Sequence, residues 1–274
     1  MSELTIWTYD WVPEGPRGFV RDLRLRWACE EAGLIYAVRT IPFDGRETNH
    51  LAHQPFGQVP FLKDEELEIF ESGAGLLHLA RKSDKLMPRD PVGEAETLQW
   101  TIAALNSIEM VTVPWWFLKM SGDENDDLTG WMGKRLDQLE RVLSEQEWLA
   151  AERFTVADLL MADVLRVSEV RSFGDRPATE AYVTRATDRT SFKKARADQI
   201  GHFEAADQKR AEEKVKLTRG LAPSIPASTL TTDWNSFFYC FTQLGTPISV
   251  LLCLFRKRRS SQNHPIGGAP SPDL

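Results

Sequence analysis

Cysteine is scarce in this chain of 274 residues. The three cysteines are Cys29, Cys240 and Cys253, and their spacing contains neither a Cys-x-x-Cys pair nor a pattern of zinc ligands. Three cysteines cannot all pair, and stable disulfides are typical of proteins in oxidising compartments. The sequence therefore argues against a secreted, disulfide-stabilised protein, and we expect neither structural zinc nor any other metal.

A surplus of positive charge is also missing. The chain has 33 Lys and Arg residues against 40 Asp and Glu residues, which gives a net charge of -7. Proteins that bind nucleic acid usually present excess basic side chains to the phosphate backbone, so nucleic acid is not an expected partner. The N-terminus, Met-Ser-Glu-Leu-Thr, also lacks the basic and apolar segments of a secretory signal. The expected location is the cytoplasm.

The uneven distribution of charge marks a C-terminal segment. Residues 215–274 hold six basic and two acidic residues, a balance of +4, which leaves -11 for the first 214 residues. Pro, Ser and Thr cluster in residues 223–232, and the chain ends in a segment rich in Gly and Pro. Such compositions do not form a packed core. We therefore interpret residues 215–274 as a tail that is disordered or loosely packed.

One uncharged stretch in this tail leaves a second interpretation open. Residues 234–255 are 22 residues without charge, and four basic residues follow them. A stretch of this length can span a bilayer about 30 Å thick. Polar residues, Gly245 and Pro247 interrupt it, and the basic cluster would place the signal-free N-terminal part across the membrane. A tail-anchored, membrane-associated protein, with residues 237–255 as the contact, stays an alternative.

The first part of the chain alternates between strand and helix signals. Residues 4–8 have the alternation and β-branched content of a strand, and residues 34–41 predict a second strand. Between them, apolar residues recur at helical spacing over residues 17–32, and Gly33 follows as a stop. A strand-helix-strand unit of this kind has parallel strands and a right-handed crossover.

A hairpin and a further helix complete the first domain, which we assign to residues 1–83. After a short helical piece at residues 47–53, two short strands are predicted at residues 60–62 and 67–70, joined by an acidic turn. A helix then starts at Ser72 and runs to about Arg81.

Strand signals are absent after Pro91. Pro88 and Pro91 fall in a segment, residues 84–92, that we interpret as a linker because proline is excluded from helix interiors. The expected second domain, residues 93–214, contains only helical periodicities. These cover residues 92–120, 128–148 and 154–170, and a shorter pair lies between 177 and 203. The fold class is an α/β domain followed by an all-α domain.

The clearest local signal in the helical domain is a capping box. Thr155 is a good N-cap, Asp158 can reach back to its amide, and Phe154 can pack onto Leu159. The expected role of this motif is structural.

Three motifs together resemble the soluble, cytosolic glutathione S-transferases, of bacterial type and with an atypical C-terminal tail. They are Gly57-Gln58-Val59-Pro60-Phe61-Leu62, Glu71-Ser72-Gly73-Ala74-Gly75-Leu76-Leu77 and Phe154-Thr155-Val156-Ala157-Asp158, in the order typical of that family. The resemblance covers about residues 4–210. It implies a thioredoxin-like first domain, a homodimer, and a transferase that activates the thiol of glutathione for conjugation to small apolar electrophiles or for thiol exchange.

The resemblance also implies where glutathione binds. Val59 and Pro60 match a cis-proline turn whose backbone pairs with the cysteinyl part, and Gln58 matches a position at the glycyl end. Glu71 and Ser72 lie where a strand ends and a helix begins, so they would hold the ammonium and carboxylate groups of the γ-glutamyl end. Ser72 could instead be only an N-cap. Three polar neighbours are interpreted as exposed loop residues: His50, His53 and Gln54.

The sequence lacks the residue that usually activates the thiol. Most family members place Ser, Cys or Tyr near the first helix, but none occurs between Asp10 and Arg26. Arg17 and Tyr9 are the candidate catalytic residues, although Arg17 could also be a solvated or dimer-contact residue. A glutathione-binding or dimerisation module without catalysis is therefore an alternative function. Cys29 is expected to be buried and unreactive.

Aromatic residues suggest where the electrophile would bind. Trp11 follows the first strand, and Trp115 and Trp116 lie in the long helical segment, where they could line an apolar pocket or belong to the core. Three arginines of the first helix are interpreted as a solvated or dimer-facing stripe: Arg21, Arg24 and Arg26.

Overall fold

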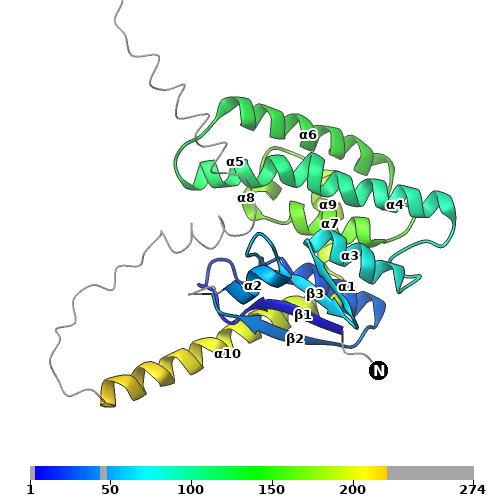
Figure 1. Cartoon of the computed structure of the whole chain (residues 1–274). Coiled ribbons are helices and arrows are strands. Elements are labelled where there is room, and N and C mark those ends of the chain that lie inside the picture. The colour runs from blue at the N-terminus through cyan, green and yellow to red at the C-terminus, as the bar shows by residue number, and fades with distance from the viewer. Residues whose placement is uncertain (1–3, 44–47, 221–274) are drawn as a thin grey trace, which may run out of the picture.

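The computed structural model describes residues 4–43 and 48–220. The uncharged stretch at residues 234–255 lies outside these residues. The described chain forms an N-terminal half around a small sheet and a C-terminal half built from helices, as Figure 1 shows. This arrangement confirms the predicted fold class of an α/β, thioredoxin-like domain followed by an all-α domain.

In the part of the chain that the structure describes, the sheet has four strands in the order β2-β1-β3-β4. Their bounds are Leu4–Tyr9 for β1, Tyr36–Ile41 for β2, Phe61–Asp64 for β3 and Leu67–Phe70 for β4. Strand β2 pairs with β1 in parallel, whereas β3 is antiparallel to both β1 and β4. The predicted parallel unit and the predicted hairpin are both confirmed.

Among the described residues, the N-terminal half has three helices: α1 (Asp22–Ala32), α2 (Thr48–His53) and α3 (Ser72–Arg81). Helix α1 begins five residues later than the periodicity predicts. The reason is Gly18, whose φ of 80° is incompatible with a right-handed helix and turns the chain before α1 can start. Gly33 ends α1 in the left-handed conformation, as expected.

The helical half contains α4 to α10. Their bounds are Pro91–Ala103 (α4), Ala104–Glu109 (η1, a π-helical segment), Met110–Met120 (α5), Asp126–Glu145 (α6), Val156–Leu165 (α7), Ser168–Arg171 (α8), Pro177–Thr187 (α9) and Thr190–Gly220 (α10). The single helix predicted over residues 92–120 is therefore α4, η1 and α5 in succession. Helix α10 continues to Gly220, well beyond Phe203, because no proline interrupts it.

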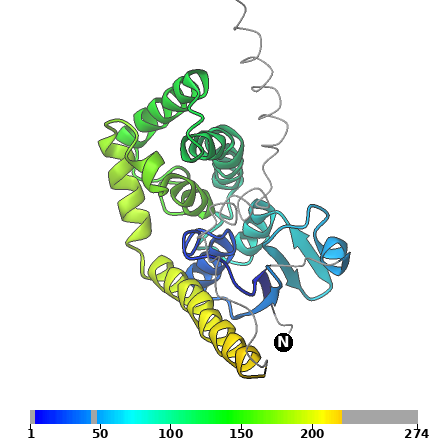
Figure 2. The same ribbon diagram turned by 90° about the vertical axis from the view of Figure 1, so that its left-hand side faces the viewer.

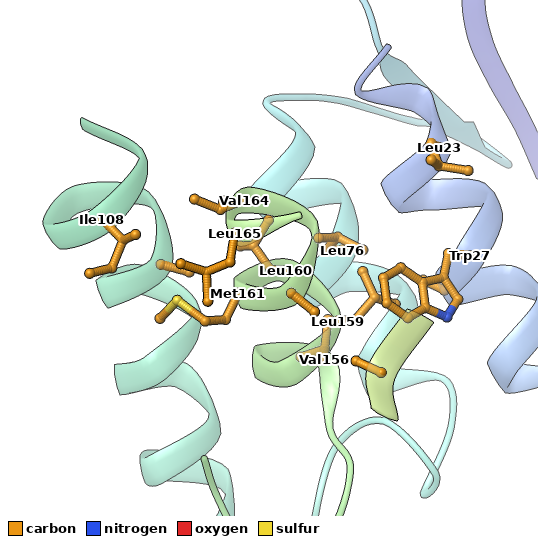
Figure 3. Packing of buried hydrophobic residues seen from close by; sticks show 14 of the residues in the cluster. Leu23, Trp27, Leu76, Ile108, Val156, Leu159, Leu160, Met161, Val164 and Leu165 are labelled. Atoms are coloured by element: carbon orange, nitrogen blue, oxygen red, sulfur yellow. The ribbon is translucent and has the colours of Figure 1, made fainter. Parts of the chain in front are cut away.

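Helix α7 lies at the centre of the shared core. All ten of its residues are buried. Figure 3 shows its side chains between Leu23 and Trp27 of α1 on one side and Ile108 of η1 on the other. Since α7 packs against both halves, its position fixes how the sheet half and the helical half meet.

The predicted capping box starts α7. The Thr155 amide donates to Oδ2 of Asp158 at 2.8 Å, and the Leu149 amide donates to Oδ1 at 2.8 Å. The Tyr182 hydroxyl donates to the same Oδ1 at 3.1 Å. This buried carboxylate thus joins the helix start to two neighbouring segments, so the structural role is confirmed.

Within residues 4–43 and 48–220, no helix combines the length and the apolar character that crossing a membrane requires.

Candidate active site

The junction between β4 and α3 has an unusual backbone. Glu71 is exposed and has a φ of 68°, which is uncommon for a residue other than glycine and is often found where the backbone serves a function. Ser72 begins α3, and no side chain caps that helix start. The first amides of α3 therefore have no capping side chain and can donate hydrogen bonds to a carboxylate, while the side chain of Glu71 can meet a cation.

The turn before β3 lies beside this junction in the sheet. The Val59–Pro60 peptide bond is cis, as the resemblance implies. Two side chains hold the turn: Oε1 of Gln54 accepts from the Gln58 amide at 3.1 Å, and Nε2 of His50 lies 2.8 Å from the Gln58 carbonyl oxygen. Val59 precedes β3, so its backbone polar groups lie outside the strand ladder.

The exposed-loop interpretation of two of these residues is wrong. His50 and Gln54 are 6% and 1% exposed, because they satisfy backbone groups of the turn that water cannot reach. His53 is exposed, as expected, and its Nδ1 lies 2.6 Å from Oε2 of Glu68.

The end of β1 carries Tyr9 to the same turn. Trp7 pairs with Phe61, so continuing the antiparallel register places Tyr9 opposite Val59. Tyr9 is fully buried in one apolar cluster with Val12 and Val59, and its ring meets the edge of Phe43. The structure thus brings this candidate catalytic residue close to the cis-proline turn.

Arg17 and Trp11 both turn toward α10. The guanidinium of Arg17 donates to both carboxylate oxygens of Asp207, at 2.6 and 2.8 Å, and to the Val12 carbonyl oxygen at 3.0 Å. The indole nitrogen of Trp11 donates to Oδ1 of Asp207 at 2.7 Å. Hydrogen bonds from Arg17 and Trp11 hold the pKa of Asp207 below its ordinary value. The positive charge of Arg17 is therefore shared with a carboxylate.

A pocket of about 240 Å³ lies between the loop before α1, helix α5 and the α7–α8 region. Its apolar walls are formed by Phe19, Val113, Trp116, Met120, Val164 and Val167. Of the three predicted tryptophans, Trp116 alone is among the residues that line it. Trp115 is 5% exposed and donates from its indole nitrogen to Thr129 at 3.1 Å, so it belongs to the core.

Charged side chains also line this pocket. Arg24 donates to Oε1 of Glu109 at 2.7 Å, to Oδ2 of Asp163 at 2.7 Å and to the hydroxyl of Ser72 at 3.1 Å. Burial alone would raise the pKa of Glu109, but Arg21 and Arg24 lower it to about 2. Arg24 therefore connects the pocket with the start of α3 through a network of paired charges.

The solvated or dimer-facing interpretation of the arginine stripe is wrong. Arg24 and Arg26 are each 3% exposed, and Arg21 is partly buried. Buried guanidinium groups require carboxylate partners, and Arg26 has one in Asp22, at 2.7 Å.

The sequence did give a partial signal for this network. Asp163 is an isolated carboxylate in the second half of α7 among apolar residues, which is typical of a buried, paired acid. Arg21 and Arg24 are three residues apart and share one helix face. No comparable signal marks Gln199 or Asp207, because most of α10 is polar.

Cys29 is fully buried, as expected, and burial raises the pKa of its thiol to about 12. The other two cysteines lie outside the described residues. In the described part of the chain, no group of three His, Cys, Asp or Glu side chains is arranged to hold a metal ion.

Known protein families match both halves of the chain. The family model described as glutathione S-transferase, N-terminal domain, matches residues 15–81, and the model for the C-terminal domain matches residues 110–189. Glutathione S-transferase 1 of Zea mays is 33% identical over 151 residues, which cover 50% of this chain and 70% of the maize protein. Glutathione S-transferase 1 of Schizosaccharomyces pombe is 30% identical over 174 residues, covering 58% of this chain and 73% of the yeast protein.

The fold also matches solved structures. A glutathione transferase from Pseudomonas putida, described with one glutathione disulfide bound per subunit, superposes with a TM-score of 0.60. The match covers 71% of this chain and 90% of that protein at 22% identity. The bacterial type stays a prediction, since the two relatives named above come from a plant and a yeast.

Proposed function

The chain belongs to the glutathione S-transferase family, and from this premise we propose that it is an enzyme that binds glutathione and activates its thiol. The reaction is conjugation to small apolar electrophiles or thiol exchange. The observation that carries the proposal is the β4–α3 junction, where the exposed Glu71 with a φ of 68° precedes an uncapped helix start.

Glutathione binds across two adjacent segments in this proposal. The γ-glutamyl carboxylate accepts hydrogen bonds from Ser72 and the first amides of α3, and its ammonium group pairs with Glu71. The backbone of Val59, before the cis bond to Pro60, pairs with the cysteinyl part, and Gln58 contacts the glycyl end. Arg24 supports this arrangement because it donates to Ser72 Oγ. The hydroxyl proton of Ser72 then points away from Arg24 and can be donated to the ligand carboxylate.

Arg17 and Tyr9 are the proposed activating groups. Tyr9 lies opposite Val59 by register, and Arg17 lies in the loop that forms one wall of the pocket. Arg17 would stabilise a thiolate over the neutral thiol by its charge. Tyr9 would do so by a hydrogen bond only if its buried hydroxyl becomes accessible to the sulfur.

The pocket lined by Trp116 is the proposed electrophile site. Its volume of about 240 Å³ and its apolar walls suit a small, largely apolar molecule. Trp11 and Trp115, the other two predicted pocket residues, do not line it: Trp11 bonds Asp207, and Trp115 packs in the core.

A homodimer and a cytoplasmic location complete the proposal. Strand β4 is at the edge of the sheet, and Phe56, Leu67 and Phe70 around it are 63%, 55% and 40% exposed. The rings of Phe56 and Phe70 are 6.3 Å apart and form an apolar patch that a second copy of the chain would cover.

The test is turnover by the purified chain with glutathione. Chlorodinitrobenzene probes conjugation, and hydroxyethyl disulfide probes thiol exchange. The proposal expects a rate above the uncatalysed reaction with at least one of them. Glutathione binding without turnover of either probe would favour the non-catalytic binding module, for which the missing Ser, Cys or Tyr near α1 is the supporting observation.

A further inference from the structure

Residues 11–21, between β1 and α1, form one wall of the pocket and carry Arg17. This loop has only short turns of its own, such as the Phe19 amide donating to the Pro16 carbonyl oxygen at 2.9 Å. The residues that fix its position come largely from α10, 179 to 196 positions later in the chain. Figure 2 shows α10 running along the N-terminal half.

Gln199 holds the second part of the loop. This side chain is fully buried. Its Oε1 accepts from the Gly18 amide at 3.0 Å, and its Nε2 donates to the Val20 carbonyl oxygen at 2.9 Å and to Asp22. The carbonyl oxygen of Gly18 accepts from Arg166 at 2.6 Å, so both polar groups of this glycine are held by the helical half.

Asp207 holds the first part of the loop. One carboxylate accepts from Trp11 at 2.7 Å and from Arg17 at 2.6 and 2.8 Å, so two residues six positions apart are tied to one point. The guanidinium of Arg210 lies 4.2 Å from the centre of the Trp11 ring. Five residues before Asp207 on α10, Nε2 of His202 is 3.1 Å from the Tyr9 carbonyl oxygen.

We propose that α10 is a clamp and that Gln199 and Asp207 are positioning residues of the active site. They fix the loop at residues 11–21 and thereby set the pocket wall and the position of Arg17 relative to the bound thiol. The inference rests on the proposed function. Reaction rates depend steeply on such positioning, because a small displacement of a reacting group removes most of the benefit of pre-orientation.

Asp207→Ala tests the clamp, and Asp198→Ala is its matched control. Asp207 is 46% exposed in its side chain, so its loss leaves the fold intact. Asp198 lies on the same helix, is exposed, and pairs with Lys194 of that helix at 2.6 Å, not with the loop. Hydrogen exchange of the amides in residues 11–21 should accelerate in Asp207→Ala and stay at the parent's rate in Asp198→Ala.

Kinetics give the second readout. In Asp207→Ala, kcat/KM for the electrophile should fall roughly tenfold, while the Kd of glutathione stays that of the parent, and Asp207→Glu should restore part of the loss. Equal exchange and equal kinetics in Asp207→Ala and Asp198→Ala would overturn the clamp. A parent chain that binds no glutathione would instead overturn the proposed function, and the exchange experiment would still decide on the clamp.

Discussion

Arg24 is the residue on which the two parts of the site depend. A buried guanidinium is costly unless carboxylates compensate it, and here Glu109 and Asp163 do so at 2.7 Å each. Both carboxylates belong to the helical half, whereas Arg24 and its third partner, Ser72, belong to the sheet half. The hydroxyl at the start of α3 is thus oriented by groups that the helical half supplies.

Arg17→Ala tests how the thiol is activated. Without the guanidinium, the pKa of glutathione bound to the protein should rise by roughly one to two units, because a donor to an anion contributes about 1.5–3 kcal/mol. Conjugation should slow more at neutral pH than at high pH. The measurement is the pH dependence of kcat/KM together with the ultraviolet absorbance of the thiolate.

Tyr9→Phe is the companion variant, and it should change the profile only if the Tyr9 hydroxyl is the donor. If both variants keep the parent's pH profile, neither side chain activates the thiol.

Cys29 should be inert in the native protein. Burial raises the pKa of its thiol to about 12, so almost none of it is thiolate at pH 7. We expect an alkylating reagent to leave Cys29 unmodified in buffer and to modify it fully in denaturant, as measured by mass spectrometry of the peptide that contains it. Rapid alkylation without denaturant would contradict the buried position.

Among the helices, the start of α7 contributes a pH-dependent amount to stability through the Asp158 carboxylate. Burial raises the pKa of Asp158 to about 6. Hydrogen bonds from Leu149, Thr155 and Tyr182 favour the charged form and partly oppose this effect. Since the folded state then binds a proton that the unfolded state has released, the contribution of Asp158 to stability falls as pH rises from about 4 to 6. Above about pH 6, the contribution of Asp158 to stability no longer changes with pH.

Asp158→Asn should remove this slope. Urea unfolding of parent and variant between pH 4 and 7 measures the free energy of unfolding of each, and the difference between them isolates the pH-dependent contribution of Asp158. Asn125→Ala, which removes the N-cap of α6, is the control, because it should cost about 1 kcal/mol at every pH. A parent-minus-variant difference that does not change with pH would contradict the raised pKa.

Local sequence patterns predicted the elements they determine. The parallel unit, the β3–β4 hairpin, the start of α3 at Ser72 and the capping box all depend on residues within a few positions of one another. The division of residues 92–120 into α4, η1 and α5 carried no such signal, because the apolar periodicity continues through the π-helical segment. The start of α1 was missed because Gly18 is held by Gln199, 181 positions away.

The site was predictable to the same extent. Glu71, Ser72 and Pro60 belong to short motifs, so the sequence alone places them at the β4–α3 junction and at the cis-proline turn. Their roles in binding glutathione stay predictions. The partners of Arg24 lie 85 and 139 positions away, so only the folded chain brings them together.

At the scale of the whole molecule, the charge network between the halves should make the fold sensitive to acid. Arg21 and Arg24 overcome burial and lower the pKa of Glu109 to about 2. The stability that Glu109 contributes is therefore present above its unfolded pKa and is lost as pH falls from about 4.5 toward 2, a change of about 3 kcal/mol.

Glu109→Gln should flatten this part of the stability curve and lower stability at pH 7, since Arg24 then keeps only Asp163 as a charged partner. Glu145→Gln, at an exposed position of α6, is the control. Denaturant unfolding between pH 2 and 7 measures both. If Glu109→Gln loses as much stability in acid as the parent does, the charge network does not cause that loss.

Isothermal titration calorimetry measures directly whether glutathione binds at the β4–α3 junction. The parent and Glu66→Ala, a change in the neighbouring exposed turn, should bind glutathione with the same affinity. The double variant Glu71→Ala and Ser72→Ala should bind at least roughly tenfold more weakly, because it loses charge-assisted contacts to both groups of the γ-glutamyl end. An unchanged affinity in a folded double variant would show that glutathione does not bind at this junction.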